Sequence, residues 1–324
     1  MRNITTAYCI FCAAVIFFFS ASSLAQTVKI TPIGSHEGEY CAYDRALIFE
    51  DPDGTRLLFD AGRTVIGPND TRLGKIDAVL LSSMHADHAG DYHISRVDSG
   101  TCAQPQAEVS TLPHSNTAAI IAGKRAKAFL GSEMYSFIRT KVEDAGGSGE
   151  QVEPLSFGGE RQIGGVRLAI VPVTHSNGID SSFINEELAG LLKFDGLTAY
   201  TGPANGYVLT FSNDLVVYLS GDSGIFADQD VTIRRFYGAE LAVINAGGVF
   251  TSGPREAAYS INELIRPRAV IPGNMNEAAT VNGRSRAGTK TAQLVKLING
   301  IPVFLPLSGR TMEFDGQGRC LRGC

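Results

Sequence analysis

The sequence lacks the excess of basic residues that proteins binding nucleic acid normally carry. Its 324 residues include 28 Lys and Arg against 33 Asp and Glu, which gives a formal net charge of -5. The one short basic run, Lys124-Arg125-Ala126-Lys127, lies in a segment with helical spacing, so we expect it to form the solvated face of a helix. We therefore expect a small-molecule substrate and no nucleic-acid partner.

The sequence has one long hydrophobic run, at its start, and lacks a second. Residues 8–19 are apolar, Arg2 precedes them, and Ser23-Leu24-Ala25 has the small-x-small form of a cleavage site. The run is too short for a comfortable membrane span. The pattern predicts a signal peptide over residues 1–25 and a mature chain over 26–324, exported to the periplasm or secreted, with no stable membrane span after cleavage. An uncleaved anchor is the alternative.

Cysteine is scarce, and the mature chain lacks the Cys-x-x-Cys spacing of structural zinc sites. Of the six cysteines, Cys9 and Cys12 lie in the predicted signal peptide. The mature chain keeps an even number, namely Cys41, Cys102, Cys320 and Cys324. In an oxidising compartment we expect these four to form disulfides. Three pairings exist, and one of them joins the two cysteines that are close in sequence, near the C-terminus, which leaves the other two to each other.

The overall composition is that of a folded protein: 44% hydrophobic and 19% charged residues, with 36 Gly and 13 Pro, exclude collagen, coiled coil and wholesale disorder. Strand-type runs open the mature chain, and helical patterns alternate with strands farther on. Strands are predicted at residues 27–33, 46–49, 56–59, 78–82, 108–112, 166–173, 205–211, 215–220, 240–245, 269–271 and 301–306, and helices at 117–130, 133–144, 229–236 and from Pro254 onward. This order predicts an α+β protein, a four-layer αββα sandwich.

The strongest group of candidate metal ligands follows an apolar predicted strand. His85, Asp87 and His88 lie there within four residues. Two imidazoles and a carboxylate can project together from such a turn. Neutral imidazole with carboxylate suits zinc, and also iron or manganese. The alternative is a polar loop with incidental histidines.

Further polar residues follow other predicted strands. His175 comes after the strand at 166–173, and Asp222 comes after the strand at 215–220. Taken alone, His175 could be a capped core histidine and Asp222 a turn carboxylate. Taken in order with the first cluster, they indicate ligands that converge at one edge of a sheet.

This succession of motifs resembles the metallo-β-lactamase superfamily, whose pattern is His-x-His-x-Asp-His, a single His, an Asp in a Gly-Asp context and a last His. The resemblance covers nearly the whole mature chain. Leu58-Phe-Asp60-Ala-Gly62 is similar to the Asp-x-Gly strand end of that family. Residues 236–258 and Ala269-Val-Ile-Pro272 resemble the branch that contains ascorbate-6-phosphate lactonase.

Two positions depart from the family pattern: Ser83 stands at the first motif His and Asn274 at the last. The resemblance implies one metal held by Ser83, His85 and His175, a second held by Asp87, His88 and Asn274, and Asp222 bridging the two. Hydroxyl and amide are weaker ligands than imidazole. We therefore expect one or two divalent metals, zinc first, with manganese or iron as alternatives.

The activity implied by the resemblance is hydrolysis by a metal-bound hydroxide, which Asp87 would orient as a catalytic residue. Expected substrates are a small ester, lactone, lactam or phosphodiester. A protein nucleophile is not indicated, because Ser223 lacks the Gly-x-Ser-x-Gly elbow. The departures at Ser83 and Asn274 favour a rival, a degenerate member that binds a ligand without turnover. An iron-dependent oxygenase on the same fold is a third hypothesis.

Loop residues supply the remaining candidates. His36 and Tyr40 lie in the loop after the first strand, and His114 ends another strand, so all three are predicted to contact the substrate. The alternative for the histidines is an ordinary surface or capping role. Residues 178–201 look like an insertion that forms either a lid or a surface hairpin.

Overall fold

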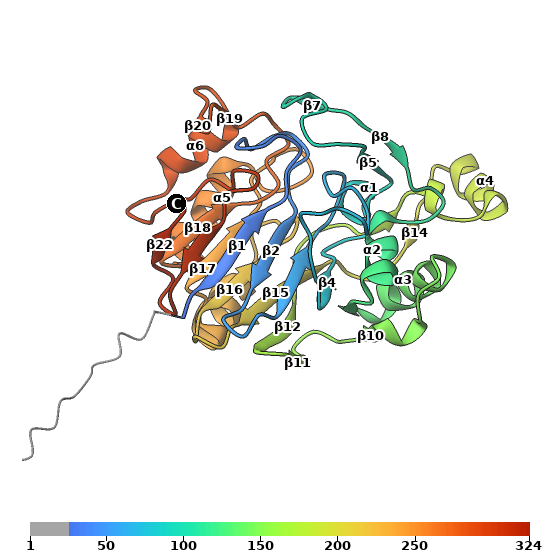
Figure 1. Cartoon of the computed structure of the whole chain (residues 1–324), viewed down its shortest axis with the longest axis horizontal. Coiled ribbons are helices and arrows are strands. Elements are labelled where there is room, and N and C mark those ends of the chain that lie inside the picture. Colours follow the sequence, from blue (N-terminus) through green and yellow to red (C-terminus); the bar gives the residue numbers. More distant parts are fainter. Residues whose placement is uncertain (1–25) are drawn as a thin grey trace, which may run out of the picture.

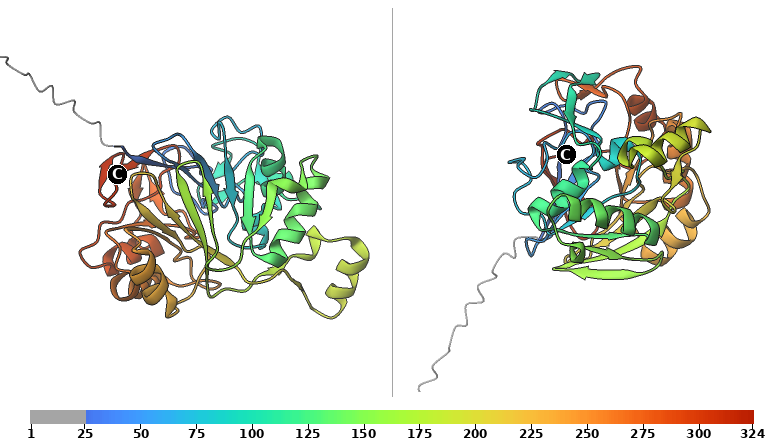
Figure 2. Two further views of the ribbon diagram at one scale, coloured as in Figure 1. Left: turned by 90° about the horizontal axis from the view of Figure 1, so that it is seen from below. Right: turned by 90° about the vertical axis from the view of Figure 1, so that its right-hand side faces the viewer.

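The computed structural model describes residues 26–324, so the predicted signal peptide lies outside the described residues. Two mixed β-sheets pack face to face, and helices cover both outer faces (Figures 1 and 2). The predicted four-layer αββα sandwich is confirmed. In the described part of the chain, no helix is both long enough and apolar enough to cross a membrane.

The first sheet has eight strands in the order β10-β9-β4-β3-β2-β1-β21-β22. Strands β1 to β3 form an antiparallel meander, and β4 then joins β3 in parallel. Their bounds are β1 (Val28–Pro32), β2 (Leu47–Glu50), β3 (Arg56–Phe59), β4 (Ala78–Leu80), β9 (Lys127–Leu130), β10 (Val152–Pro154), β21 (Met312–Phe314) and β22 (Cys320–Arg322).

The second sheet has six strands in the order β11-β12-β15-β16-β17-β18. Strand β15 is antiparallel to both β12 and β16, while β16, β17 and β18 are mutually parallel, so the carboxyl ends of β12, β16, β17 and β18 share one edge. Their bounds are β11 (Glu160–Ile163), β12 (Val166–Pro172), β15 (Asn205–Thr210), β16 (Val216–Leu219), β17 (Leu241–Ile244) and β18 (Ala269–Pro272).

Strand side chains alternate between two apolar layers, as the two-residue period of a strand requires. In β2, Phe49 points into the core between the sheets, whereas its neighbour Ile48 faces the helices outside. Helices α2 (Asn116–Lys124) and α3 (Ser132–Asp144) cover the first sheet. The second sheet is covered by η3 (Gln229–Tyr237), α5 (Pro254–Tyr259), η4 (Ser260–Ile265) and α6 (Lys290–Leu297).

Two predicted elements were wrong. The predicted helix at 117–130 ends at Lys124, because Arg125 adopts a left-handed conformation with φ 54° and the chain continues as β9 between β4 and β10. The predicted strand at 301–306 makes a single bridge, between Val270 and Val303. Pro302 and Pro306 lack the N–H groups that a longer ladder needs.

Short elements fill the connections. The segment 178–201, hereafter the flap, contains β13 (Gly178–Ile179), η2 (Ser181–Phe183), α4 (Glu186–Phe194) and β14 (Ala199–Tyr200), and α4 projects from the body (Figures 1 and 2). The rest are α1 (Ala86–Ala89), β5 (Tyr92–Ile94), β6 (Gly100–Thr101), β7 (Gln104–Pro105), β8 (Ala107–Ser110), η1 (Gly149–Gln151), β19 (Thr280–Val281) and β20 (Arg284–Ser285).

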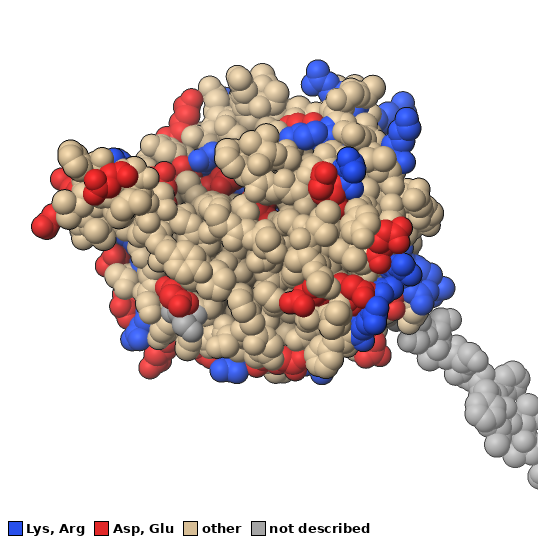
Figure 3. Space-filling view, turned by 180° about the vertical axis from the view of Figure 1, so that it is seen from behind, with Lys and Arg blue, Asp and Glu red and all other residues tan. Residues whose placement is uncertain are grey.

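All four cysteines of the described chain are paired, as predicted. The bridges are Cys41–Cys102 and Cys320–Cys324. The first joins two loops that are 61 residues apart in sequence and lie beside the first sheet. On the face drawn in Figure 3, charged side chains of both signs are interspersed around a broad uncharged area.

Candidate metal centre

Polar side chains gather where strands of both sheets end at the same edge of the sandwich. The strands themselves are apolar and buried, and each gives way to a polar residue as it leaves the sheet. Asp60 follows β3, residues 83–88 follow β4, His175 follows β12, Asp222 follows β16 and Asn274 follows β18.

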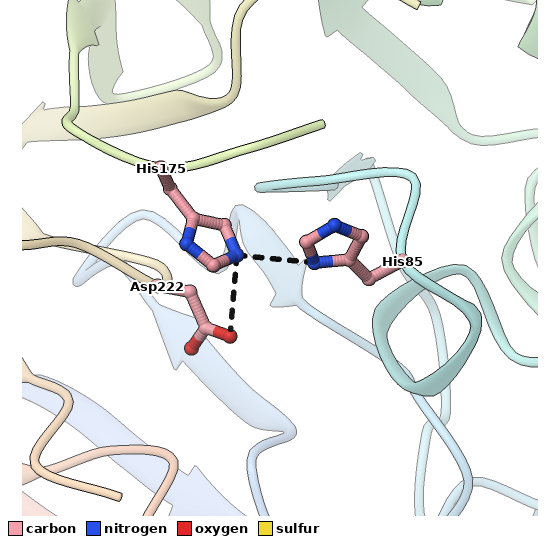
Figure 4. Close-up of side chains that lie close together, drawn as sticks. All are labelled: His85, His175 and Asp222. Carbon is pink, nitrogen blue, oxygen red and sulfur yellow. Dashed lines mark hydrogen bonds and ion pairs between the residues drawn. The ribbon is translucent and has the colours of Figure 1, made fainter. Parts of the chain in front are cut away.

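Three of these side chains converge on one point (Figure 4). His175 Nε2 lies 3.0 Å from His85 Nδ1 and 3.8 Å from Asp222 Oδ2. Ligand atoms around tetrahedral zinc are about 3.3 Å apart, because zinc–nitrogen bonds are about 2.0–2.1 Å long. All three ligand atoms lie within 4.8 Å of one another, so a modest movement of the side chains would bring them around one divalent metal ion. Within residues 26–324, no other group of His, Cys, Asp and Glu side chains comes together in this way.

The protonation states also suit a metal. Burial lowers the pKa of both His85 and His175, so each imidazole is neutral and offers a lone pair. Burial alone would raise the pKa of Asp222, but the charge and hydrogen bond of His88, with Arg45 and Asn274, lower it to about 2. Asp222 is therefore an ionised carboxylate at neutral pH.

A close approach of the two sheets positions Asp222. Gly221 has φ 53°, and a Cβ there would lie 2.5 Å from the Cβ of Ser82 at the end of β4. Asn245, which follows β17, holds the next residue by accepting from the Ser223 N–H at 3.2 Å and donating to its carbonyl at 3.3 Å. Sequence reasoning missed Asn245, whose only signal is its place after an apolar strand.

His88 is fully buried between two carboxylates. Its Nδ1 lies 2.8 Å from Asp60 Oδ2, and its Nε2 lies 3.2 Å from Asp222 Oδ2. Burial and Arg45 lower the pKa of His88, but Asp222, Asp60 and Asp87 outweigh them and raise it to about 10. Asp60, which also accepts from the Ser82 backbone and hydroxyl, is the carboxylate that orients this imidazole. The sequence analysis placed Asp60 in the Asp-x-Gly strand end but did not predict that it orients His88.

Asp87 is paired with a residue that the sequence analysis did not identify. Its Oδ2 lies 2.7 Å from Nη1 of Arg45, whose side chain is 3% exposed, while the Asp87 side chain is 32% exposed. Burial would raise the pKa of Asp87, but Arg45, His88 and Arg63 hold it well below its usual range. Arg45 is near because it precedes β2, which runs antiparallel to β3.

Asn274 lies in the site, and Ser83 lies two residues before His85 in the chain. Ser83 is fully buried, and its hydroxyl has no hydrogen-bond partner among the described residues. Asn274 donates from Nδ2 to Asp222 Oδ1 at 2.9 Å, while its Oδ1 has no partner within the described chain. In this arrangement Asn274 orients Asp222 through its amide nitrogen, and the metal-ligand role of both residues stays a prediction.

The predicted substrate contacts have other surroundings. Tyr40 is 1% exposed, and its hydroxyl donates to the Pro272 carbonyl at 3.2 Å, so the side chain is shielded from solvent. The half-buried His36 has ring nitrogens 3.1 Å from Ser35 Oγ and 3.3 Å from the Gly100 carbonyl. His114 is exposed in a turn.

Two open pockets flank the converging side chains. One, of about 360 Å³, lies between His85 and the base of the flap, where Ile179, Asp180 and Thr198 line it. The other, of about 550 Å³, is bordered by Thr174, next to His175, and by the exposed loop that carries Val249 and Phe250. Both are large enough for part of a small organic molecule.

Comparison with known proteins agrees with this geometry. Residues 55–273 match the β-lactamase superfamily domain. A UPF0173 metal-dependent hydrolase of Koribacter versatilis is 27% identical over 238 residues, which cover 72% of this chain and 82% of that protein. Another UPF0173 metal-dependent hydrolase, from Methanocorpusculum labreanum, is 32% identical over 221 residues, which cover 68% of this chain and 76% of that protein.

The fold is found in solved structures as well. Igni18, described as a novel metallo hydrolase from the hyperthermophilic archaeon Ignicoccus hospitalis, superposes with a TM-score of 0.57 and 21% sequence identity. The match covers 89% of this chain and 99% of that one. At this identity the likeness shows a shared fold.

Proposed function

Because the chain belongs to the β-lactamase superfamily, and within it to the UPF0173 metal-dependent hydrolases, we propose that it hydrolyses a small ester, lactone, lactam or phosphodiester. It is a metal-dependent hydrolase of that superfamily. The observation that carries the proposal is the convergence of His85, His175 and Asp222 with the protonation states that a divalent cation needs.

Each side chain of the site is given a separate role in the proposed hydrolysis. A divalent cation bound at this site would acidify an attacking water and polarise the scissile bond. His85, His175 and Asp222 would hold the cation. Asp87 has a strongly lowered pKa, so it would orient the attacking water by accepting a hydrogen bond rather than by taking up its proton.

The surroundings support a small-molecule substrate. One pocket is lined by His85 and the other by Thr174, next to His175, and the face in Figure 3 has no continuous basic surface over the residues that it describes. The likeness of residues 236–258 to the branch containing ascorbate-6-phosphate lactonase supports a lactone within this class.

We also propose that the enzyme acts after export. The charged, apolar and small-residue pattern of residues 1–25 supports a signal peptide. Both disulfide pairs support an oxidising compartment, because such bonds persist there and are rare in a reducing cytoplasm.

Metal analysis with a substrate panel tests the activity. Residues 26–324 would be loaded with zinc, manganese or iron(II), and assayed on lactones, lactams, esters and phosphodiesters. His175→Ala should lower metal affinity and kcat/KM by more than about 100-fold, because loss of a direct ligand exceeds the 10–100-fold cost of losing its supporting contacts. His93→Ala is the matched control and should leave both unchanged, because His93 lies in β5 with its Nδ1 2.7 Å from the Ile94 carbonyl oxygen and is not one of the predicted site residues. Full metal retention by His175→Ala would contradict the assignment.

A further inference from the structure

A buried arginine lies beside the side chains predicted to hold a second metal. Arg45, Asp60, His88, Asp222 and Asn274 line one small cavity of about 10 Å³. The Arg45 guanidinium reaches Asp87 at 2.7 Å, and the charge of Arg45 lowers the pKa of Asp87 and of Asp222. Its Nε has no hydrogen-bond partner among the described residues. The guanidinium is therefore held by charge and by its packed stem.

The backbone makes room for that stem. Gly62 has φ 53°, and a Cβ there would lie 3.1 Å from Arg45 Cδ and 2.8 Å from the Asp87 carbonyl oxygen. Any larger residue at this position would push against the arginine. The Asp-x-Gly strand end therefore supplies both Asp60, which orients His88, and the space through which Arg45 enters the site.

The four side chains predicted to hold the second metal are already engaged with one another or with Arg45. Asp87 is paired with Arg45, His88 lies between Asp60 and Asp222, and Asn274 donates to Asp222. In the described chain the one set that converges as a metal cluster is His85, His175 and Asp222. The three ligands of the first metal position thus converge, whereas the side chains predicted for the second are paired with other protein groups.

The charges of the site favour one divalent ion over two. A divalent ion held by Asp87 and His88 would lie beside the Arg45 guanidinium, whose side chain is 3% exposed. Two like charges repel strongly in such a buried site.

We propose that the Arg45 guanidinium takes the place of the second metal, so that the enzyme works with one divalent ion held by His85, His175 and Asp222. Arg45 is a positioning residue in this arrangement: its Nη1 holds Asp87 Oδ2 at 2.7 Å, and it supplies the positive charge that a second ion would otherwise bring. The proposal rests on the proposed metal-dependent function. It also accounts for Asn274, because a position occupied by a guanidinium does not need a last imidazole.

Zinc stoichiometry tests this, measured by isothermal titration and by elemental analysis after dialysis. The wild-type chain and Asn274→His should each bind one zinc ion, because Arg45 is present in both. Arg45→Met combined with Asn274→His should bind two, because the cation is gone, the apolar stem is kept beside Gly62, and an imidazole is restored. Arg63→Met combined with Asn274→His is the matched control and should bind one, because Arg63 pairs with Asp91 instead.

The other outcomes decide against the proposal. Two zinc ions in the wild type or in Asn274→His alone would show that Arg45 does not fill the second position. A single ion in the Arg45→Met, Asn274→His double variant would also show that Arg45 does not fill the second position. If circular dichroism showed this variant to be unfolded, Arg45→Gln would replace Arg45→Met. No zinc in the wild type would instead overturn the zinc site itself and, with no binding of manganese or iron(II), the proposed function.

Discussion

Ser83 is a buried hydroxyl that lacks a partner among the described residues, an arrangement that costs about 1–3 kcal/mol unless a bound ligand completes it. Ser83→Ala should leave the free energy of unfolding of the metal-free protein unchanged or raise it by about 1 kcal/mol. If the hydroxyl faces the bound ion or its water, metal affinity should fall at the same time. Chemical denaturation and zinc titration measure the two effects.

A second serine provides the control for this experiment. Ser260 in η4 is also buried, and its hydroxyl is also unpartnered in the described chain, but it lies in the outer helical layer. Ser260→Ala should have a similar effect on unfolding and no effect on zinc affinity. Equal zinc affinities for Ser83→Ala and the wild type would show that Ser83 has no part in metal binding.

The residues of the site divide into those that local sequence reveals and those that it does not. His85, His175 and Asp222 each follow an apolar strand, so their convergence could be predicted from strand ends that share one edge. Arg45 could not, because it lies 42 positions before Asp87 and reaches it only through the pairing of β2 with β3. Residue type and spacing carry no signal for such a contact.

At the scale of elements, the flap is the feature most open to experiment. Leu191 is 65% exposed and Phe194 is 89% exposed, while the base of the flap lines the pocket beside His85. Leu191→Ser combined with Phe194→Ser should leave Tm and zinc stoichiometry unchanged, because neither side chain is buried. KM for substrates with bulky apolar groups should rise if the flap closes over them.

The control for the flap experiment is the same kind of substitution at an exposed aromatic residue outside the flap. Phe236 in η3 is 76% exposed and lies on the other sheet's helical layer, so Phe236→Ser should change neither KM nor Tm. An unchanged KM in the flap variant across the whole substrate panel would assign the flap to the surface-hairpin alternative.

Element boundaries were harder to predict than element order. The apolar residues of α2 and β9 fall at spacings that also suit one continuous helix, so the sequence predicted a single element. The break depends on Arg125 in a left-handed conformation, which glycine would have signalled and arginine does not. Pairing of β9 with β4 then decides the strand, and this pairing is not visible locally.

At the scale of the whole molecule, the metal ligands come from both sheets. His85 follows β4 of the first sheet, while His175 and Asp222 follow β12 and β16 of the second. An ion that needs ligands from both sheets binds only the folded chain. It should stabilise the folded state by about 2.7 kcal/mol when its free concentration is about 100 times Kd. Thermal unfolding with zinc and with a chelator should show a Tm several degrees lower after chelation.

His175→Ala separates this effect from a general action of the chelator. Because this variant lacks a ligand and should bind zinc more than about 100-fold more weakly, the same zinc concentration should raise its Tm far less than that of the wild type. A zinc-dependent rise in Tm of equal size in His175→Ala and the wild type would place the stabilising ion elsewhere on the protein.

The division of ligands between the sheets gives the molecule a natural place to be split. The turn at residues 156–159, between β10 and β11, is where the chain first passes from the first sheet to the second, and it returns to the first sheet at β21 and β22. A fragment of residues 26–156 would carry His85, Asp87 and His88, and a fragment of residues 157–324 would carry His175, Asp222 and Asn274. Neither fragment holds the converging set alone. A divalent ion bound between the two fragments would therefore favour their association into one folded molecule.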